Sequence, residues 1–151
     1  MTGFSLSLSA WSTQLNHDSS AFVADQELIE ALESRALPVL CEEDQVLFLQ
    51  EDPPTGLYLL RSGNATLSME SPAGEPIMCI HVSAGSVLGL PALIGNQPYS
   101  LTAKAQKGAR LSFVSKDDFS SLMVAQPSLS LSILRVLAAE VRTARYAITA
   151  L

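Results

Sequence analysis

Two histidines and two cysteines are the only residues of this sequence suited to soft metal or redox chemistry. Cys79 and His81 lie two positions apart, so on a strand they would share one face and offer two metal ligands. A structural metal site needs about four converging ligands, and His17 lies far away in a Ser-rich N-terminal stretch. We therefore expect no metal site, and we expect Cys79 and His81 to be half-buried core residues.

Nucleophilic catalysis also lacks a recognisable motif. The sequence contains no Gly-x-Ser-x-Gly elbow, no P-loop and no Gly-x-Gly-x-x-Gly loop. Its serines lie at expected turns, helix caps and strand faces, and neither histidine has a predicted partner. We expect a protein that is not an enzyme and that holds no cofactor.

The composition is that of one folded domain with an acidic surface. With 48% hydrophobic and 16% charged residues, the 151-residue chain can fill a core, which argues against disorder. Fifteen acids against nine bases give a net charge of −6, and free nucleic acid is a poor partner for such a surface.

The sequence shows no membrane or secretion signal. Its longest apolar run, Val87–Gly95, is broken by Gly and Pro, whereas a bilayer span needs about 20 residues. The N-terminus has no positively charged segment, and the two cysteines fit neither a disulfide framework nor a zinc spacing. We expect a cytoplasmic protein with buried free thiols and no membrane contact.

A helix is expected to follow a loose lead-in over residues 1–24. Asp25 is a good N-cap, and Pro38 is expected to end the helix. Between them apolar residues recur every four positions, at Leu28, Leu32 and Ala36.

From Val39 to Val114 the hydrophobic period changes to two. Short apolar segments alternate with Gly, Pro and Asn turns about every ten residues, which predicts an antiparallel sandwich or barrel. Pro91–Ile94 interrupts this rhythm. Because Pro suits the first turn of a helix and Gly95-Asn96 its end, we expect one inserted helical turn there.

The C-terminal part returns to helix. Ser115 begins a capping box, Pro127 interrupts, and a last helix is expected from about Ser128 to Ala150. This helix has two apolar strips. One contains Ile133 and Val136; the other is a heptad seam of Leu134, Leu137, Val141, Ala144, Ile148 and Leu151.

A helix with two apolar strips needs two partners. Either strip alone is compatible with ordinary core packing, but together they favour a parallel or crossed homodimer. We therefore divide the chain into the lead-in, a barrel domain over 25–126 and a dimerisation helix over 127–151.

This order of elements resembles the cyclic-nucleotide-binding domain of the cAMP receptor protein/FNR superfamily over residues 25–148. The similar segments are Tyr58–Gly63, Ala84–Gly89 and a phosphate-binding cassette formed by Gly89–Ile94 and Gln97–Ala105. The resemblance implies a regulatory, mainly β protein with flanking α-helices. Its fold would be an antiparallel double-stranded β-helix (jelly-roll) barrel with an N-terminal helix, an inserted cassette helix and a long C-terminal dimer helix.

Two departures from the family pattern bear on function. In nucleotide-binding members, a Glu after the cassette glycine binds the ribose and an Arg after the Pro pairs with the cyclic phosphate; here those positions are Leu90 and Tyr99. Between Leu90 and Ala103 the sequence has no Lys, Arg or acid. Burying a phosphodiester without a cation costs several kcal/mol. We expect no tight binding of cAMP or cGMP, unless the partner subunit's Arg142 or the partner's Arg145 supplies the charge.

The resemblance assigns ligand binding to a degenerate cassette. Backbone amides at the start of the helical turn, together with the Ser100 hydroxyl, could still face an anion. The candidate ligand-binding residues are Gly89, Leu90, Ala92, Leu93, Ile94, Tyr99, Ser100 and Thr102.

Three functions remain open. The chain could be a stand-alone sensor for a different, more apolar small molecule, a protein–protein interaction module with a side-chain-filled pocket, or a cyclic-nucleotide receptor with a variant binding mode. Transcription factors of the superfamily carry a helix-turn-helix after the dimer helix. Because this sequence ends at Leu151, we expect no direct DNA binding.

Overall fold

The computed structural model describes residues 22–150, with side chains up to residue 142. Its first helix, α2 (Gln26–Glu33), begins as expected at Asp25, whose Oδ1 accepts a hydrogen bond from the Leu28 amide at 3.0 Å. The helix ends at Glu33, five residues before Pro38, so the expectation that Pro38 ends it was wrong. Pro38 instead lies in the edge strand β1 (Leu37–Leu40), where a residue without an N–H is tolerated.

Within residues 22–150, eight antiparallel strands form two four-stranded sheets that share one core. The first sheet has the order β1, β8 (Arg110–Ser115), β3 (Gly56–Ser62), β6 (Val87–Leu88). The second has the order β2 (Gln45–Phe48), β7 (Thr102–Ala105), β4 (Ala65–Glu70), β5 (Pro76–Val82). Apolar side chains from both sheets meet in a single buried cluster that includes Leu60, Leu111, Leu67 and Ile80. The expected antiparallel, mainly β fold with flanking helices is confirmed.

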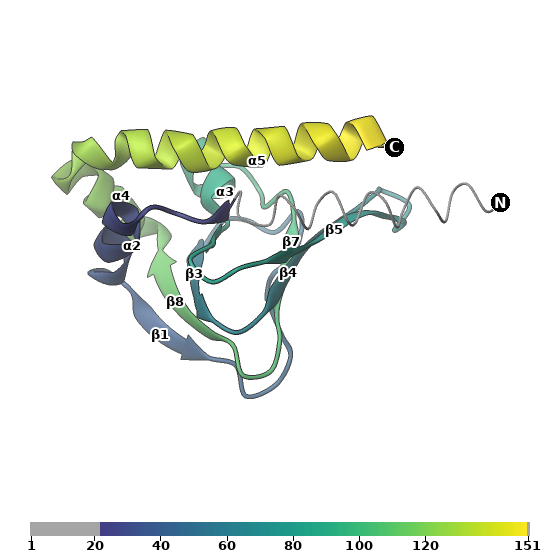
Figure 1. Ribbon diagram of the computed structural model, residues 1–151, viewed down its shortest axis with the longest axis horizontal. Helices are drawn as coiled ribbons and strands as arrows, with labels where there is room; N and C mark the ends of the chain where they lie inside the picture. Colours follow the sequence, from purple (N-terminus) through teal and green to yellow (C-terminus); the bar gives the residue numbers. More distant parts are fainter. Residues whose placement is uncertain (1–21, 151) are drawn as a thin grey trace.

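The helices pack on the other face of the first sheet. They are α2, the cassette helix α3 (Leu90–Gly95), α4 (Lys116–Ala125) and α5 (Ser130–Ala150), with a short 3-10 turn at Pro127–Leu129. Leu57 and Leu59 of β3 are fully buried against Phe119 of α4 and Ile133 and Val136 of α5. Figure 1 shows α5 lying across the top of the sheets, directly above α3.

A polar contact joins the first and last helices. Ser132 Oγ of α5 donates to Asp25 Oδ2 at 2.7 Å, and Arg135 Nη1 lies 3.9 Å from the same oxygen. The hydrogen bonds from Ser132 and the Leu28 amide hold the pKa of Asp25 below its ordinary value. The residue that caps α2 therefore also fixes the start of α5.

Strand β5 places Cys79 and His81 on the outer face of the second sheet. Met78, Ile80 and Val82 alternate with them and are buried, while Cys79 and His81 are exposed. They do share one face, but the expectation of half-buried core residues was wrong, because no element covers that side of β5 in the described chain. The expectation of buried thiols holds for Cys41 alone.

The described helices were also tested for membrane-spanning length. No single helix among residues 22–150 is long and apolar enough to cross a bilayer. A bent pair, Lys116–Ala125 with Pro127–Arg142, reaches the required length and hydropathy only when its two members are taken together across a 104° bend.

Candidate functional site

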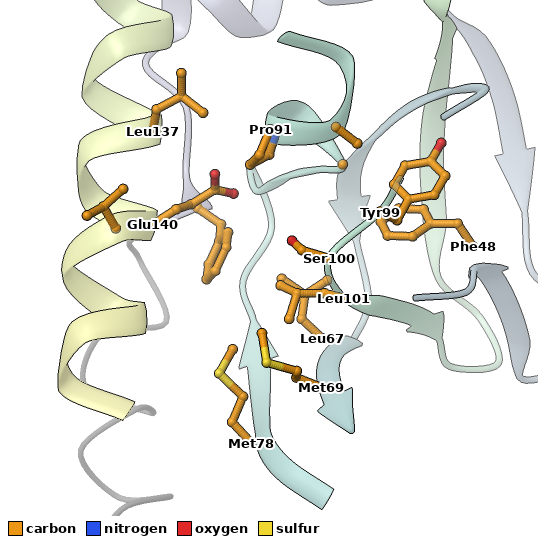
Figure 2. A pocket seen from close by; sticks show the side chains of 14 residues that line it. Phe48, Leu67, Met69, Met78, Pro91, Tyr99, Ser100, Leu101, Leu137 and Glu140 are labelled. Carbon is orange, nitrogen blue, oxygen red and sulfur yellow. The ribbon is translucent and has the colours of Figure 1, made fainter. Parts of the chain in front are cut away.

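A cavity of about 260 Å³ lies between α5, α3 and strands β2, β4 and β5 of the second sheet (Figure 2). Helix α5 forms one wall with Leu137, Glu140 and Val141. The remaining walls are almost entirely apolar and comprise Phe22, Phe48, Leu67, Met69, Met78, Gly89, Pro91, Ala92, Tyr99, Ser100 and Leu101. The site is therefore an apolar pocket with helix α5 as one of its walls.

Tyr99 forms the end of the cavity farthest from α5. Its ring stacks on Phe48, with centroids 3.9 Å apart and planes 12° from parallel, and the residue is only 2% exposed. The hydroxyl donates to the Gly56 carbonyl at 2.6 Å and accepts from the amides of Thr55 and Gly56 at 3.0 and 3.2 Å. All the hydrogen-bonding capacity of this phenol is used within the protein, so it offers no donor to a guest.

Gly89 brings the cassette close against Tyr99. Its φ of 97° lies in the left-handed region, and a Cβ there would come within 3.1 Å of Tyr99 Cε1 and 3.3 Å of the Gly56 carbonyl oxygen. A glycine is required at this turn because the backbone and the tyrosine ring touch. The glycine of the cassette therefore allows the close packing that holds the Tyr99 ring in place.

Only part of the predicted cassette reaches the cavity. Gly89, Ala92, Tyr99 and Ser100 line it. The other four lie elsewhere: Leu90 and Leu93 are buried in the helix-side core, Ile94 is 47% exposed, and Thr102 Oγ1 accepts a hydrogen bond from the Gln50 amide.

The backbone amides proposed for anion binding are also not all available. The Leu93 amide donates to the Gly89 carbonyl at 3.4 Å within α3. Among the described residues, no lysine or arginine lines the cavity, and Arg142 is exposed on α5. The side chain of Arg145 lies outside the described residues. The missing positive charge noted in the sequence is thus also missing from the described walls.

Glu140 is the functional candidate that sequence reasoning missed. Its carboxyl group points into the cavity from α5 (Figure 2), and its Oε2 is buried with no hydrogen-bond partner in the described structure. Burial raises the pKa of Glu140 from 4.5 to about 8, so the group is mostly protonated at neutral pH. A signal was present, since Glu140 is the only acid between residues 130 and 150 and lies beside the apolar seam.

The two apolar strips of α5 face different surroundings. Ile133 and Val136 are buried against the chain's own sheet, whereas Leu134 and Val141 are each 59% exposed. Leu137 is half-buried and lines the cavity. The side chains of the other predicted dimer residues, Ala144 and Ile148, lie outside the described residues, and the homodimer itself stays a prediction.

No group of three or more His, Cys, Asp or Glu residues that could hold a metal ion occurs within residues 22–150. The cavity is the candidate site among the described residues, because the Glu140 carboxyl is directed into it without a hydrogen-bond partner for Oε2.

Comparison with known proteins gives the family. The model for the cyclic nucleotide-binding domain matches residues 38–126, more than half of the chain. This chain belongs to the cyclic nucleotide-binding domain family. The resemblance seen in the sequence is confirmed, and the two sheets form the β-roll of that family. A comparison with curated proteins found no match.

Solved structures support the same fold. The catabolite activator protein of Thermus thermophilus is similar with 22% identity and a TM-score of 0.70, over 87% of this chain and 62% of that one. The N-terminal domain of a transcriptional regulator from Streptomyces coelicolor A3(2) is similar with 23% identity and a TM-score of 0.60, over 85% and 88%. The c-di-GMP responsive regulator CLP of Xanthomonas campestris is similar with 20% identity and a TM-score of 0.60, over 82% and 60%. The chain thus spans about three fifths of the first and third of these proteins.

Replacing Tyr99 by Phe should destabilise the fold. The change removes the hydroxyl that pairs three backbone groups of Thr55 and Gly56, and we expect a loss of about 1–3 kcal/mol in the free energy of unfolding. Urea denaturation measures it. Tyr58→Phe is the matched control, because its half-buried hydroxyl has no hydrogen bond to the described residues. Equal effects of the two changes would show that the Tyr99 network contributes nothing.

Replacing Glu140 by Gln should stabilise the protein in a pH-dependent manner. Below pH 4.5 the carboxyl is protonated whether the chain is folded or unfolded, and its burial costs nothing extra. Between pH 4.5 and about 8 only the unfolded state ionises, so wild-type stability falls relative to the variant. The full difference between the two pKa values would give a larger effect, but a shift of α5 would hydrate part of the charge. We therefore expect the variant to be more stable than the wild type by about 1–3 kcal/mol at pH 8.

The measurement is urea denaturation of both proteins from pH 4 to pH 9. Glu43→Gln makes the same chemical change at an exposed position and should leave the pH profile unchanged. A wild-type advantage over Glu140→Gln that grows with pH would mean that Glu140 has an ionic partner, contrary to the geometry.

Proposed function

We propose that this chain is a non-enzymatic, cytoplasmic regulatory domain that senses a small apolar molecule and does not bind cAMP or cGMP tightly. One observation carries the proposal: Tyr99 fills, with a buried and fully bonded side chain, the position at which nucleotide-binding relatives carry the phosphate-binding arginine. A cyclic phosphate entering this cavity would lose its hydration without gaining a cation among the described walls.

The remaining volume favours a sensor over an interaction module with a filled pocket. Tyr99 closes only one end, and about 260 Å³ stays open beside it. An apolar cavity of about 150 Å³ is already large enough to bind benzene. The walls are apolar with few polar groups, which is typical of small-molecule sites.

The position of α5 suggests how a ligand would be read. Leu137, Glu140 and Val141 contribute three side chains of α5 to the cavity wall, so a bound molecule would contact the helix directly. A ligand that fits one placement of α5 better than another shifts the population toward that placement. Family members signal by a shift of their last helices, and we propose the same for residues 119–151.

We also propose that the chain forms a homodimer through residues 127–151. Leu134 and Val141 lie one heptad apart on α5 and are each 59% exposed, although Val141 also borders the cavity. Leucine and valine at heptad spacing typically form the interface between two helices.

The nucleotide prediction is tested by calorimetry. Titration of the full chain with cAMP or cGMP should give no binding heat up to about 1 mM, because the missing cation makes phosphate burial unfavourable. Glu140→Gln should also fail to bind, since it removes a carboxyl group but adds no cation. A dissociation constant of about 10 μM or tighter, which corresponds to a binding free energy of about −7 kcal/mol, would overturn the proposal.

The dimer is tested by sedimentation velocity. The double variant Leu134→Glu, Val141→Glu places two like charges on the exposed strip of each helix and should convert the dimer to monomer. Val124→Glu is the matched control, because Val124 is 83% exposed on α4, outside the strip, and its change should leave the dimer intact. A monomeric wild-type chain, or a dimer that survives the double change, would contradict the proposal.

A further inference from the structure

The cavity offers a guest one strong polar contact. Of its three polar side chains, the Tyr99 hydroxyl is fully used by Thr55 and Gly56, and Ser100 is exposed at the rim. Glu140 is the only charged residue among the described walls, and its Oε2 has no partner. A ligand that is oriented at all in this cavity is therefore oriented by the Glu140 carboxyl.

No other described residue near Glu140 carries a charged or titratable side chain that could pair with its carboxyl. Met69 and Met78 face it from the second sheet, Pro91 from α3, and Leu101 from the segment that enters β7. None of these titrates, and Tyr99 at the far end is the only other titratable wall residue. The binding free energy of a guest therefore depends mainly on which of its groups contacts the Glu140 carboxyl.

Three classes of guest differ sharply in that contact. A carboxylate or phosphate would be repelled by ionised Glu140 and finds no cation in the walls. A neutral alcohol would make an ordinary hydrogen bond with the protonated group. An ammonium would pair with the ionised carboxylate through a charge-assisted hydrogen bond, which is about twice as strong as a neutral one.

The charge of the whole chain acts in the same direction. Its net charge of −6 repels anions and raises the local concentration of cations at its surface. The size of the cavity sets the size of the guest. Scaling from benzene in about 150 Å³ gives an apolar body of roughly ten non-hydrogen atoms for this volume.

We infer that the cavity binds a small apolar amine, an aryl- or alkylammonium whose nitrogen pairs with the Glu140 carboxylate while its body fills the space between Leu137, Met69 and Met78. This inference rests on the proposed function and names its ligand class.

The proposed contact has a proton signature. Free Glu140 is mostly protonated below pH 8, and it must lose that proton to pair with an ammonium that keeps its own. The carboxyl proton goes to the buffer, so close to one proton is released per amine bound at pH 6.5, and almost none at pH 9.5. A neutral ligand bound to protonated Glu140 releases none.

The experiment is calorimetry of the full chain with three probes of nearly equal size: phenylethylamine, phenylethanol and phenylacetate. Titrations at pH 6.5 in two buffers of different ionisation enthalpy measure the protons released. At pH 9, where Glu140 is already ionised, we expect phenylethylamine to bind at least about tenfold more tightly than phenylethanol, and phenylacetate to bind most weakly. At pH 6.5 we expect near-unit proton release on binding of the amine.

Two variants locate the contact. Glu140→Gln should weaken phenylethylamine by about tenfold or more and abolish proton release, while phenylethanol binding stays within about twofold. Glu43→Gln, the exposed control, should change neither. Leu137→Trp should fill the cavity and remove binding of amine and alcohol alike; amine binding that survives it would place the amine on the acidic surface and overturn the inference.

The remaining outcomes separate this inference from the proposed function. Phenylethanol binding as tightly as the amine, or amine binding without proton release, overturns the amine class but leaves an apolar-ligand sensor. Absence of binding by all three probes overturns both the amine class and the open-cavity sensor. Tight cAMP binding overturns the proposed function whatever the amine does.

Discussion

The closed contact between Tyr99 and the turn at Thr55-Gly56 is the interaction on which the rest of the site depends. A phenol that donates to one carbonyl and accepts from two amides is held at both ends, with Phe48 stacked on its ring. The left-handed Gly89 brings the cassette backbone against the same ring. Because these contacts are buried, they close the end of the pocket that the family resemblance assigns to phosphate binding.

Closing one end directs the remaining cavity toward α5. The open volume has apolar side chains from the second sheet on one side and Leu137 and Glu140 on the other. Helix α5 is also tied to the first helix through Ser132 and Asp25, and it presents Leu134 outward. Helix α5 therefore contacts the ligand cavity, the chain's own core and the surface proposed for dimerisation. A small displacement of α5 would change the packing at all three.

Much of the fold could be predicted because its signals are local. Asp25 and Ser115 accept the capping hydrogen bonds expected from their positions, and α3 runs from Leu90 to Gly95 between the caps Gly89 and Asn96, as the Pro91 and Gly95-Asn96 signals indicate. The change of the hydrophobic period to two locates the strand region, although β1 begins at Leu37, two residues before the predicted start at Val39. The order of these elements over a hundred residues was specific enough to indicate the family before the structure was known.

What could not be predicted depends on contacts distant in sequence. That Leu90 turns into the helix-side core while Tyr99 closes the cavity is decided by which neighbours each meets. Pro38 lies in a strand because β8 pairs with it on one side only. Glu140 was not singled out from the sequence, because only the placement of α5 over the roll brings its carboxyl into an apolar cavity.

The central claim is that this cavity cannot neutralise a cyclic phosphate. The phosphorus NMR resonance of cAMP, followed while the full chain is added in excess at neutral pH, reports on that group alone. The account predicts a resonance whose chemical shift and width stay those of free cAMP. A saturable shift or broadening that Glu43→Gln preserves would show a phosphate held by the protein, and would contradict the account.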